Sequence, residues 1–278
     1  MVPAANIWGF LFAFLLTGIL PIVLLIVLTI KKKLNIRPMF TGMLAFFISQ
    51  IVVRIPLMNL PPILSSLVAL AASMPFLYLF IISFTAGLFE ESARLIGANL
   101  LKKNRTFKDA FSFGVGHGLC EVIIVVGLTH LTNIIYSLLI NSTGVLPGVS
   151  ASDPAFMILL QQIVAAPPLL VLAGVIERVS AVLLHISLSI FIFYGVNSRR
   201  VWLWYPLSIA IHAAFNFILL WVANFLNIWL AEAFGVVFAV LLLLYAKSLR
   251  GRFPAEATPS AVDAAPPFLP PETPAPPQ

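Results

Sequence analysis

Repeated apolar runs of about 20 residues restrict this chain to one broad fold class. Runs of this length are typical of a protein that crosses the bilayer several times as helices. The composition agrees, since 61% of the residues are hydrophobic, only 9% are charged and the mean hydropathy is +1.06. A soluble domain carries about a quarter charged residues. We therefore predict an all-α, polytopic transmembrane helix bundle embedded in a lipid bilayer.

The basic residues predict how the helices cross the membrane. Thirteen of the sixteen Lys and Arg residues fall in four clusters, at 31–37, 102–108, 199–200 and 247–252. If every cluster is cytoplasmic, the positive-inside rule is satisfied by about seven spans with the N-terminus outside and the C-terminus inside. These spans are 6–30, 39–55, 75–101, 109–136, 177–198, 201–221 and 224–246. The same distribution explains the net charge of +6, so we expect no nucleic-acid partner.

Three regions need separate treatment. The apolar segments at about 60–73 and 155–175 each contain a Pro-Pro pair, and we expect re-entrant or interfacial segments there, with an additional short span as the alternative. A Pro/Ala-rich stretch follows the last span, which predicts a helical domain over 1–250 and a disordered cytoplasmic tail over 251–278. The single Cys120 excludes an internal disulfide and a Cys-rich metal site.

Ionisable residues of four predicted spans fall at one depth, about 12–20 Å from the cytoplasmic helix ends. They are Glu90, Glu91, His117, Glu121, His185 and His212. Buried charges are costly in a bilayer, by roughly 2.5–3.5 kcal/mol at a helix centre, which favours a functional role. Pairs spaced four apart share a helix face, namely Glu90 with Arg94, His117 with Glu121, and His212 with Asn216. Gly114, Gly116 and Gly118 flank His117 and predict close approach of another helix or a substrate backbone.

This set of residues allows a limited chemistry. A carboxylate and two or three imidazoles bind a divalent metal such as zinc and leave a position open for water. A second carboxylate acts as general base on that water, and Asn216 donates a hydrogen bond to an oxyanion. Without a metal, Glu, His and Asn together still activate water. Arg94 neutralises one of the two glutamates.

Three short motifs resemble those of the CPBP intramembrane proteases, the group that includes CAAX prenyl proteases and bacteriocin self-immunity proteins. They are "EESAR" (90–94), "FGVGH" (113–117) and "HAAFN" (212–216), in the family's order, although the arginine lies one residue closer to the glutamates than in the family pattern. The longer stretches "GVGHGLCE" (114–121) and "ERVSAVLLH" (177–185) look more like the YhfC branch of intramembrane proteases. This resemblance covers about 75–220.

The resemblance implies an intramembrane endopeptidase, of metallo or glutamate type, in a prokaryotic plasma membrane. Glu90 or Glu91 would activate water with Arg94 and Asn216 in supporting catalytic roles, while His117 and His212 would bind metal or the oxyanion. The expected metal ligands are His117, Glu121, His185 and His212, for zinc or another divalent ion, and a metal-free route stays open. The expected substrate is a membrane-embedded or lipidated peptide. The chamber is expected between the helices and open toward the cytoplasmic leaflet.

Other interpretations of the same residues are a structural ion-pair cluster, a divalent-cation or proton transporter, and a non-catalytic immunity or scaffold protein. A transporter requires polar residues that continue to both surfaces, whereas the outer half of the predicted bundle looks dry. His130 is expected outside the site, Glu177 and Arg178 at a helix start as a cap or local salt bridge, and Arg54 and Glu232 at the interfaces.

Overall fold

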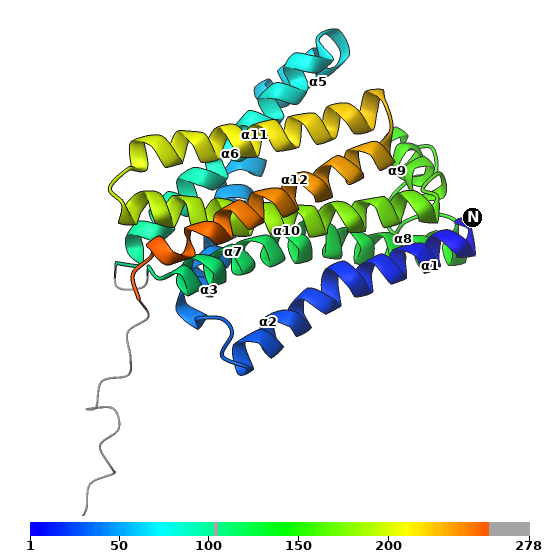
Figure 1. Cartoon of the computed structure of the whole chain (residues 1–278). Helices are drawn as coiled ribbons and strands as arrows, with labels where there is room; N and C mark the ends of the chain where they lie inside the picture. Colours follow the sequence, from blue (N-terminus) through cyan, green and yellow to red (C-terminus); the bar gives the residue numbers. More distant parts are fainter. Residues whose placement is uncertain (103–104, 256–278) are drawn as a thin grey trace, which may run out of the picture.

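Seven long apolar helical segments form the body of the protein in the computed structural model, which describes residues 1–102 and 105–255 (Figure 1). Each is long and apolar enough to cross a membrane. They are Ala4–Ile30, Ile36–Met58, Pro75–Leu100, Phe107–Thr143, Pro168–Asn197, Val201–Phe225 and Ile228–Arg252. The predicted all-α bundle of seven spans is therefore confirmed. Its orientation in the membrane stays a prediction.

Three of the seven segments contain a π-helical turn, a feature often found near functional sites. Their parts are α1 (Ala4–Phe14), η1 (Leu15–Ile19) and α2 (Leu20–Ile30); α3 (Ile36–Phe46), η2 (Phe47–Arg54) and α4 (Ile55–Met58); and α7 (Phe107–Glu121), η3 (Val122–Gly127) and α8 (Leu128–Thr143). The other elements are α5 (Pro61–Ser73), α6 (Pro75–Leu100), α9 (Pro154–Val164), α10 (Pro168–Asn197), α11 (Val201–Phe225), α12 (Ile228–Ser248) and η4 (Leu249–Arg252).

The segment predicted at 155–175 is not one unit. Its first part forms the short helix α9, which ends at Val164, and its last part belongs to α10, which begins at Pro168. The fifth span therefore starts nine residues before the predicted position 177. Proline favours the first helical position, because its missing N–H needs no partner there, so Pro168 starts the longer helix. The segment at 60–73 corresponds to α5, and the predicted tail lies outside the described residues from 256 onward.

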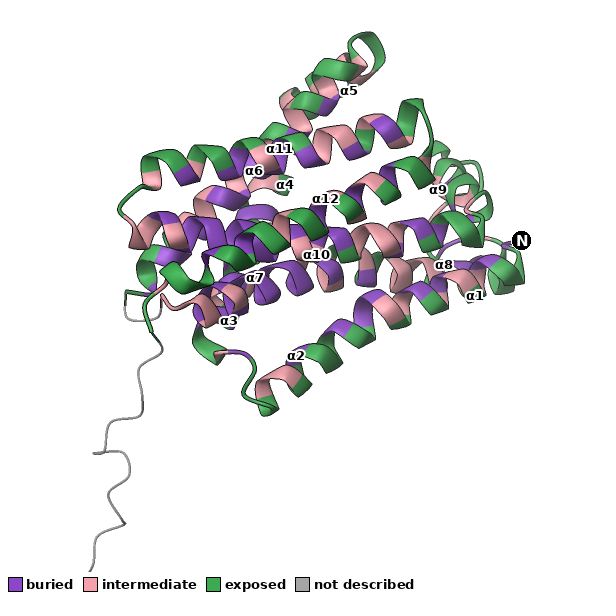
Figure 2. Ribbon diagram, in the orientation of Figure 1, coloured by how far each residue is buried: buried purple, intermediate pink, exposed green. Residues whose placement is uncertain are grey.

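Helix α10 is the central helix of the bundle. In its most apolar stretch 72% of the residues are buried, against 17–33% in the other six spans (Figure 2). It packs against α6, α7, α11 and α12. The surrounding helices expose large apolar side chains, such as Ile26 and Leu241, as a lipid-facing surface requires. Polar side chains that face α10 are therefore shielded from lipid.

Helices α3 and α7 approach each other closely enough to contact through backbone atoms. A Cβ atom added to Gly116 would lie 2.1 Å from the carbonyl oxygen of Met39, and one added to Gly42 would lie 2.1 Å from that of Phe113. At the start of the pair, the Asn35 amide Nδ2 donates to an oxygen of Asp109 over 2.6 Å. These contacts fix the position of His117, the residue after Gly116.

The basic connections lie at one end of the bundle and the N-terminus at the other. Helix order places residues 31–37, 105–108, 199–200 and 247–252 at the same end, called the basic end below. Figure 1 shows η4 at the left, near this end, and the N-terminus with α9 at the right, called the N-terminal end. Depth in the bundle is described relative to these two ends.

Candidate functional site

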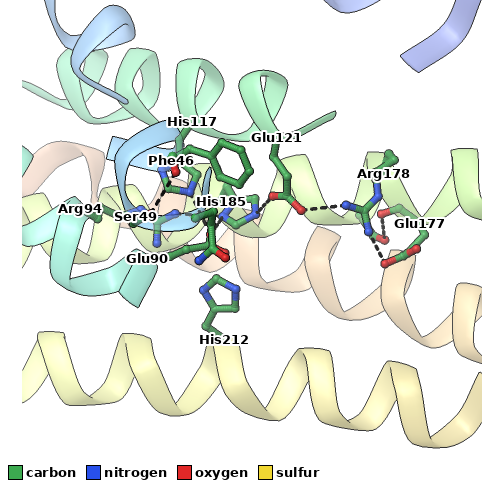
Figure 3. A network of polar contacts seen from close by, with 12 residues as sticks. Phe46, Ser49, Glu90, Arg94, His117, Glu121, Glu177, Arg178, His185 and His212 are labelled. Carbon is green, nitrogen blue, oxygen red and sulfur yellow. Dashed lines mark hydrogen bonds and ion pairs between the residues drawn. The ribbon is translucent and has the colours of Figure 1, made fainter. Parts of the chain in front are cut away.

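Glu90 on α6 faces two imidazole rings from two other helices. His117 Nε2 of α7 is hydrogen-bonded to Glu90 Oε2 over 3.0 Å, and His185 Nδ1 of α10 lies 3.8 Å from the same oxygen (Figure 3). The two rings have their centroids 4.8 Å apart. The glycines at 114 and 118 allow this, because a Cβ at Gly114 would lie 2.5 Å from the Ile186 Cα and one at Gly118 would lie 3.1 Å from the Val182 Cα. The predicted close approach beside His117 is confirmed.

Glu91 lies on the neighbouring face of α6 and is fully buried. Arg94 donates to its Oε1 oxygen, and His212 Nδ1 of α11 lies 2.8 Å from the same oxygen. The arginine thus pairs with the glutamate three residues before it. Neutralisation of a glutamate by Arg94 was expected, and its partner is Glu91. The pair ties α11 to α6 at the depth of the site.

His185 connects this centre to a chain of ion pairs that runs toward the N-terminal end. Its Nε2 lies 2.6 Å from Glu121 Oε2, and Arg178 Nη1 donates to Glu121 Oε1 over 2.8 Å. Arg178 also donates to Glu177, as Figure 3 shows. The contact places the Glu121 carboxylate against Nε2, the ring nitrogen of His185 that faces away from Glu90. Arg94 Nη2 donates to His185 Nδ1 over 2.9 Å, so the Nδ1 lone pair faces Arg94 and the hydrogen of the neutral ring is on Nε2.

Glu90, His117 and His185 together offer a candidate metal-binding group. One donor atom from each residue lies within 4.8 Å of the others, and all three residues are buried. Tetrahedral zinc with bonds of about 2.0–2.1 Å holds its ligands about 3.3–3.5 Å apart, so the observed contacts of 3.0 and 3.8 Å fit such an ion. An ion would replace the proton between His117 and Glu90 and displace the Arg94 donor from His185.

Two residues expected as metal ligands lie outside this group. Glu121 contacts His185 through the nitrogen that faces away from Glu90, and His212 contacts Glu91. The His212 ring is still close, with its centroid 5.3 Å from that of His185. The predicted convergence of four helices is thus confirmed. The role of each residue remains a proposal.

A polar cavity of about 270 Å³ borders the centre and extends toward the N-terminal end. Its charged and polar lining residues are Gln50, Arg54, Ser83, Glu90, Glu121, Glu177, Arg178 and Asn216. Arg54 is four residues from the end of α4 at Met58, and Glu177 is nine residues from the start of α10, so both lie beyond the centre on the N-terminal side. The expectation of a chamber open to the basic end, with a dry opposite half, is wrong.

The cavity also corrects three residues that the sequence placed elsewhere. Arg54 was expected at the interface, but its guanidinium donates to Gln50 Oε1, Thr85 Oγ1 and the Ile82 carbonyl in the cavity wall. Arg178 and Glu177 form the expected local salt bridge, but not at a helix start. A usable signal existed in the sequence. Of the sixteen basic residues, only Arg54, Arg94 and Arg178 fall outside the four clusters. Arg54 and Arg178 line the cavity, and Arg94 pairs with Glu91 at the centre.

The remaining ionisable residues lie away from the centre. His130 stacks on Phe10 of α1, with the ring centroids 6.0 Å apart, so its expected position outside the site agrees with the structure. Glu232 of α12 was expected at the interface but is 7% exposed. It makes no ion pair with the part of the chain that the structure describes.

Comparison with known proteins identifies the family. The model of the family described as "YhfC intramembrane metalloprotease" matches residues 16–239. The chain belongs to this family. It is also 31% identical over 206 residues to the "Uncharacterized membrane protein YhfC" of Bacillus subtilis (strain 168), which covers 71% of this chain and 78% of that protein. No solved structure matches.

Membership in the YhfC family extends the resemblance seen in the motifs, because the match begins in the first span and ends in the last. The chain is accordingly an integral membrane protein, and the Bacillus relative fits the expected prokaryotic origin. The metalloprotease description agrees with a buried group of one glutamate and two histidines that suits a metal ion. The printed name of the relative adds nothing on activity.

Proposed function

We propose that this YhfC-family protein is an intramembrane peptidase whose active site contains Glu90. Its substrate is a membrane-embedded or lipidated peptide. One observation supports the proposal above all. Donor atoms of Glu90, His117 and His185 lie within 4.8 Å of one another, and Glu90 also lines a polar cavity. A buried structural ion pair needs no cavity, whereas hydrolysis needs space for water and a peptide bond beside the reactive group.

Glu90, rather than Glu91, is the group that contacts the attacking water. Glu90 borders the cavity, while Glu91 is 0% exposed and is held by Arg94 and His212. Without a metal, Glu90 directs Oε2 at the two imidazoles, which leaves Oε1 to accept the proton of the water and return it to the leaving amine. Glu91, Arg94 and His212 hold α6 and α11 in register around this carboxylate.

A divalent cation is the proposed cofactor, and zinc suits the donors best. Glu90, His117 and His185 would hold it, and when bound it would polarise the scissile carbonyl and acidify water. Glu121 orients His185 from the other ring nitrogen. Asn216, which borders the same cavity, donates a hydrogen bond to the carbonyl oxygen as negative charge develops on it.

The site lies within the bundle, which limits the substrate. Lipid-facing apolar helices surround α10, so a peptide reaches Glu90 only from the cavity on the N-terminal side. A peptide that is already in the membrane, or is anchored there by a lipid, does not have to be transferred from water into the bilayer to reach this depth. We therefore propose a membrane-associated peptide as the substrate class.

The test uses the full-length protein in vesicles with a library of membrane-associated fluorogenic peptides. Removal of the general base predicts a loss of kcat/KM of roughly 10²–10⁴-fold in Glu90→Gln, with a similar loss in His117→Ala. Arg37→Gln, at an exposed position on α3, is the control and should keep wild-type activity.

Three outcomes discriminate between the alternatives. Equal hydrolysis by wild type and Glu90→Gln would exclude the proposed centre. Activity that survives complete chelation, yet is lost in Glu90→Gln, would indicate the metal-free glutamate route. Cation flux that depends on Glu90, without hydrolysis of any peptide, would favour a transporter.

A further inference from the structure

Arg54 stands out among the charges of the cavity because it lacks a carboxylate partner. Arg178, on another wall, pairs with both Glu121 and Glu177, and Arg94 pairs with Glu91. No carboxylate lies within ion-pair distance of Arg54 over the described ranges 1–102 and 105–255. Its three donor contacts go to neutral oxygens, which leaves two of its five N–H groups for another acceptor.

Two neighbours of Arg54 have unused polar atoms. Gln50 and Ser83 line the same cavity and are only 4% and 2% exposed, and their Nε2 and Oγ atoms have no hydrogen-bond partner among the described residues. A buried polar atom without a partner is costly, so such atoms indicate a missing ligand or water. Nε2 is a donor and Oγ can donate, so together with the guanidinium they present donors to an oxygen-rich group.

The position of Arg54 relative to Glu90 suits a substrate contact. Arg54 Nη2 donates to the Ile82 carbonyl, eight residues before Glu90 on α6, a separation of about 12 Å along the helix. An extended peptide covers that distance with about three or four residues. Arg54, Ile55 and Ile82 also line a second cavity under α5, so the guanidinium lies where the two cavities meet.

We propose that Arg54, Gln50 and Ser83 form a subsite that binds a carboxylate of the substrate peptide, three or four residues from the bond that Glu90 hydrolyses. The planar guanidinium binds carboxylates through two parallel hydrogen bonds, and its burial strengthens the contact. The carboxylate belongs to the end of the peptide or to an acidic side chain. This inference rests on the proposed peptidase function.

The experiment compares three peptides that differ only in one carboxylate. The first peptide is amidated at its C-terminus and has Gln at the fourth position beyond the bond that is hydrolysed. The second peptide has Glu at that position. The third peptide keeps Gln but ends at that position with a free carboxylate. Each is presented to full-length protein in phosphatidylcholine vesicles. Binding is measured by anisotropy in Glu90→Gln, so that no hydrolysis is needed, and KM and kcat are measured with Glu90 intact.

We expect the second peptide, the third or both to bind roughly 10- to 100-fold tighter than the first, as hydrogen bonds to charged groups do. Which of them gains identifies the side chain or the chain end as the source. The ratio should fall to about one in Arg54→Gln, through KM, and be partly kept in Arg54→Lys. Gln50→Leu should reduce it several-fold. Arg37→Gln, at an exposed position on α3, should keep it.

Equal binding of all three peptides to protein with Arg54 intact, or a preference that survives Arg54→Gln, would overturn the subsite. A preference lost when phosphatidylglycerol replaces phosphatidylcholine would overturn it too, since an anionic lipid headgroup would then be the occupant. Thermal unfolding of each variant verifies that it is folded, and Arg54→Lys serves if Arg54→Gln is not. Tighter binding of the peptides that carry the carboxylate, without hydrolysis of any peptide, would exclude the proposed function and support the subsite. Hydrolysis of all three peptides without such a preference would support the proposed function and exclude the subsite.

Discussion

The contact between Glu121 and His185 predicts how metal affinity responds to a change outside the three donors. Glu121 Oε2 lies 2.6 Å from His185 Nε2, while His117 Nδ1 has no hydrogen-bond partner within the described chain. Only one of the two imidazoles is therefore supported by a carboxylate. Glu121→Gln keeps the shape of that side chain but removes its charge, so His185 becomes a weaker ligand and the other two donors are unaffected.

Loss of such a supporting partner typically costs 10- to 100-fold in metal affinity, or about 1.4–2.8 kcal/mol. We expect Glu121→Gln to weaken zinc binding by about this factor without changing its stoichiometry. The assay is a competition titration with a chromogenic chelator on purified protein in detergent. His117→Ala should abolish the site, because it removes a donor, and Arg37→Gln, at an exposed position, should bind zinc as the wild type does.

Three results would refute the reasoning. Wild-type affinity in Glu121→Gln would show that the carboxylate does not support His185. Complete loss of zinc, as in His117→Ala, would make Glu121 a direct ligand, as the sequence suggested. Absence of zinc binding by the wild type would remove the metal site itself.

Three further changes test the packing around the site, each by a stability measurement on protein in detergent. Gly116→Ala places a Cβ against the α3 backbone and should lower the free energy of unfolding by about 1–3 kcal/mol. Gly174→Ala places a Cβ in open space on a helix and should raise it by about 0.5–1 kcal/mol. Equal melting temperatures of the two variants would contradict this. Glu91→Gln leaves the buried Arg94 without its partner and should cost about 3–5 kcal/mol, and most of it should return in the double variant with Arg94→Met; no recovery would show that the pair is not the cause. Asn6→Leu removes two hydrogen bonds to the end of α9, so amide exchange in α9 should rise roughly tenfold or more, while unchanged exchange would mean that these bonds do not hold it.

The number and limits of the spans followed from the sequence because the bilayer imposes a length. An apolar run of about 20 residues has few alternatives to a spanning helix, and the basic clusters mark where the runs end. The error at α10 has a clear cause. Glu177 and Arg178 were placed at the start of the helix, as a cap or local salt bridge, yet Glu121 of α7 is the partner that holds Arg178 inside the bundle. That partner belongs to a different helix, so one segment alone does not reveal it.

The meeting of the polar residues was predictable from depth, but their pairing was not. Counting residues from the basic ends puts Glu90, Glu91, His117 and His212 at one level. The rotation of each helix about its own axis then decides which atoms face each other. Glu90 and Glu91 differ by only a fraction of a turn on α6, and this difference decides which of them pairs with Arg94. Backbone contacts between helices, such as that of Gly116 with Met39, set this rotation. They are tertiary contacts, so the sequence of one helix does not reveal them.

Charge balance connects the candidate metal site with the subsite at Arg54. The network and cavity contain four carboxylates against three guanidinium groups, which leaves one negative charge when the histidines are neutral; these are Glu90, Glu91, Glu121 and Glu177 against Arg54, Arg94 and Arg178. Buried charge is tolerated where it is compensated, so this excess favours a cation. A divalent ion reverses the excess to one positive charge. A substrate carboxylate at Arg54 then brings the sum to zero, so each ligand should bind more tightly in the presence of the other.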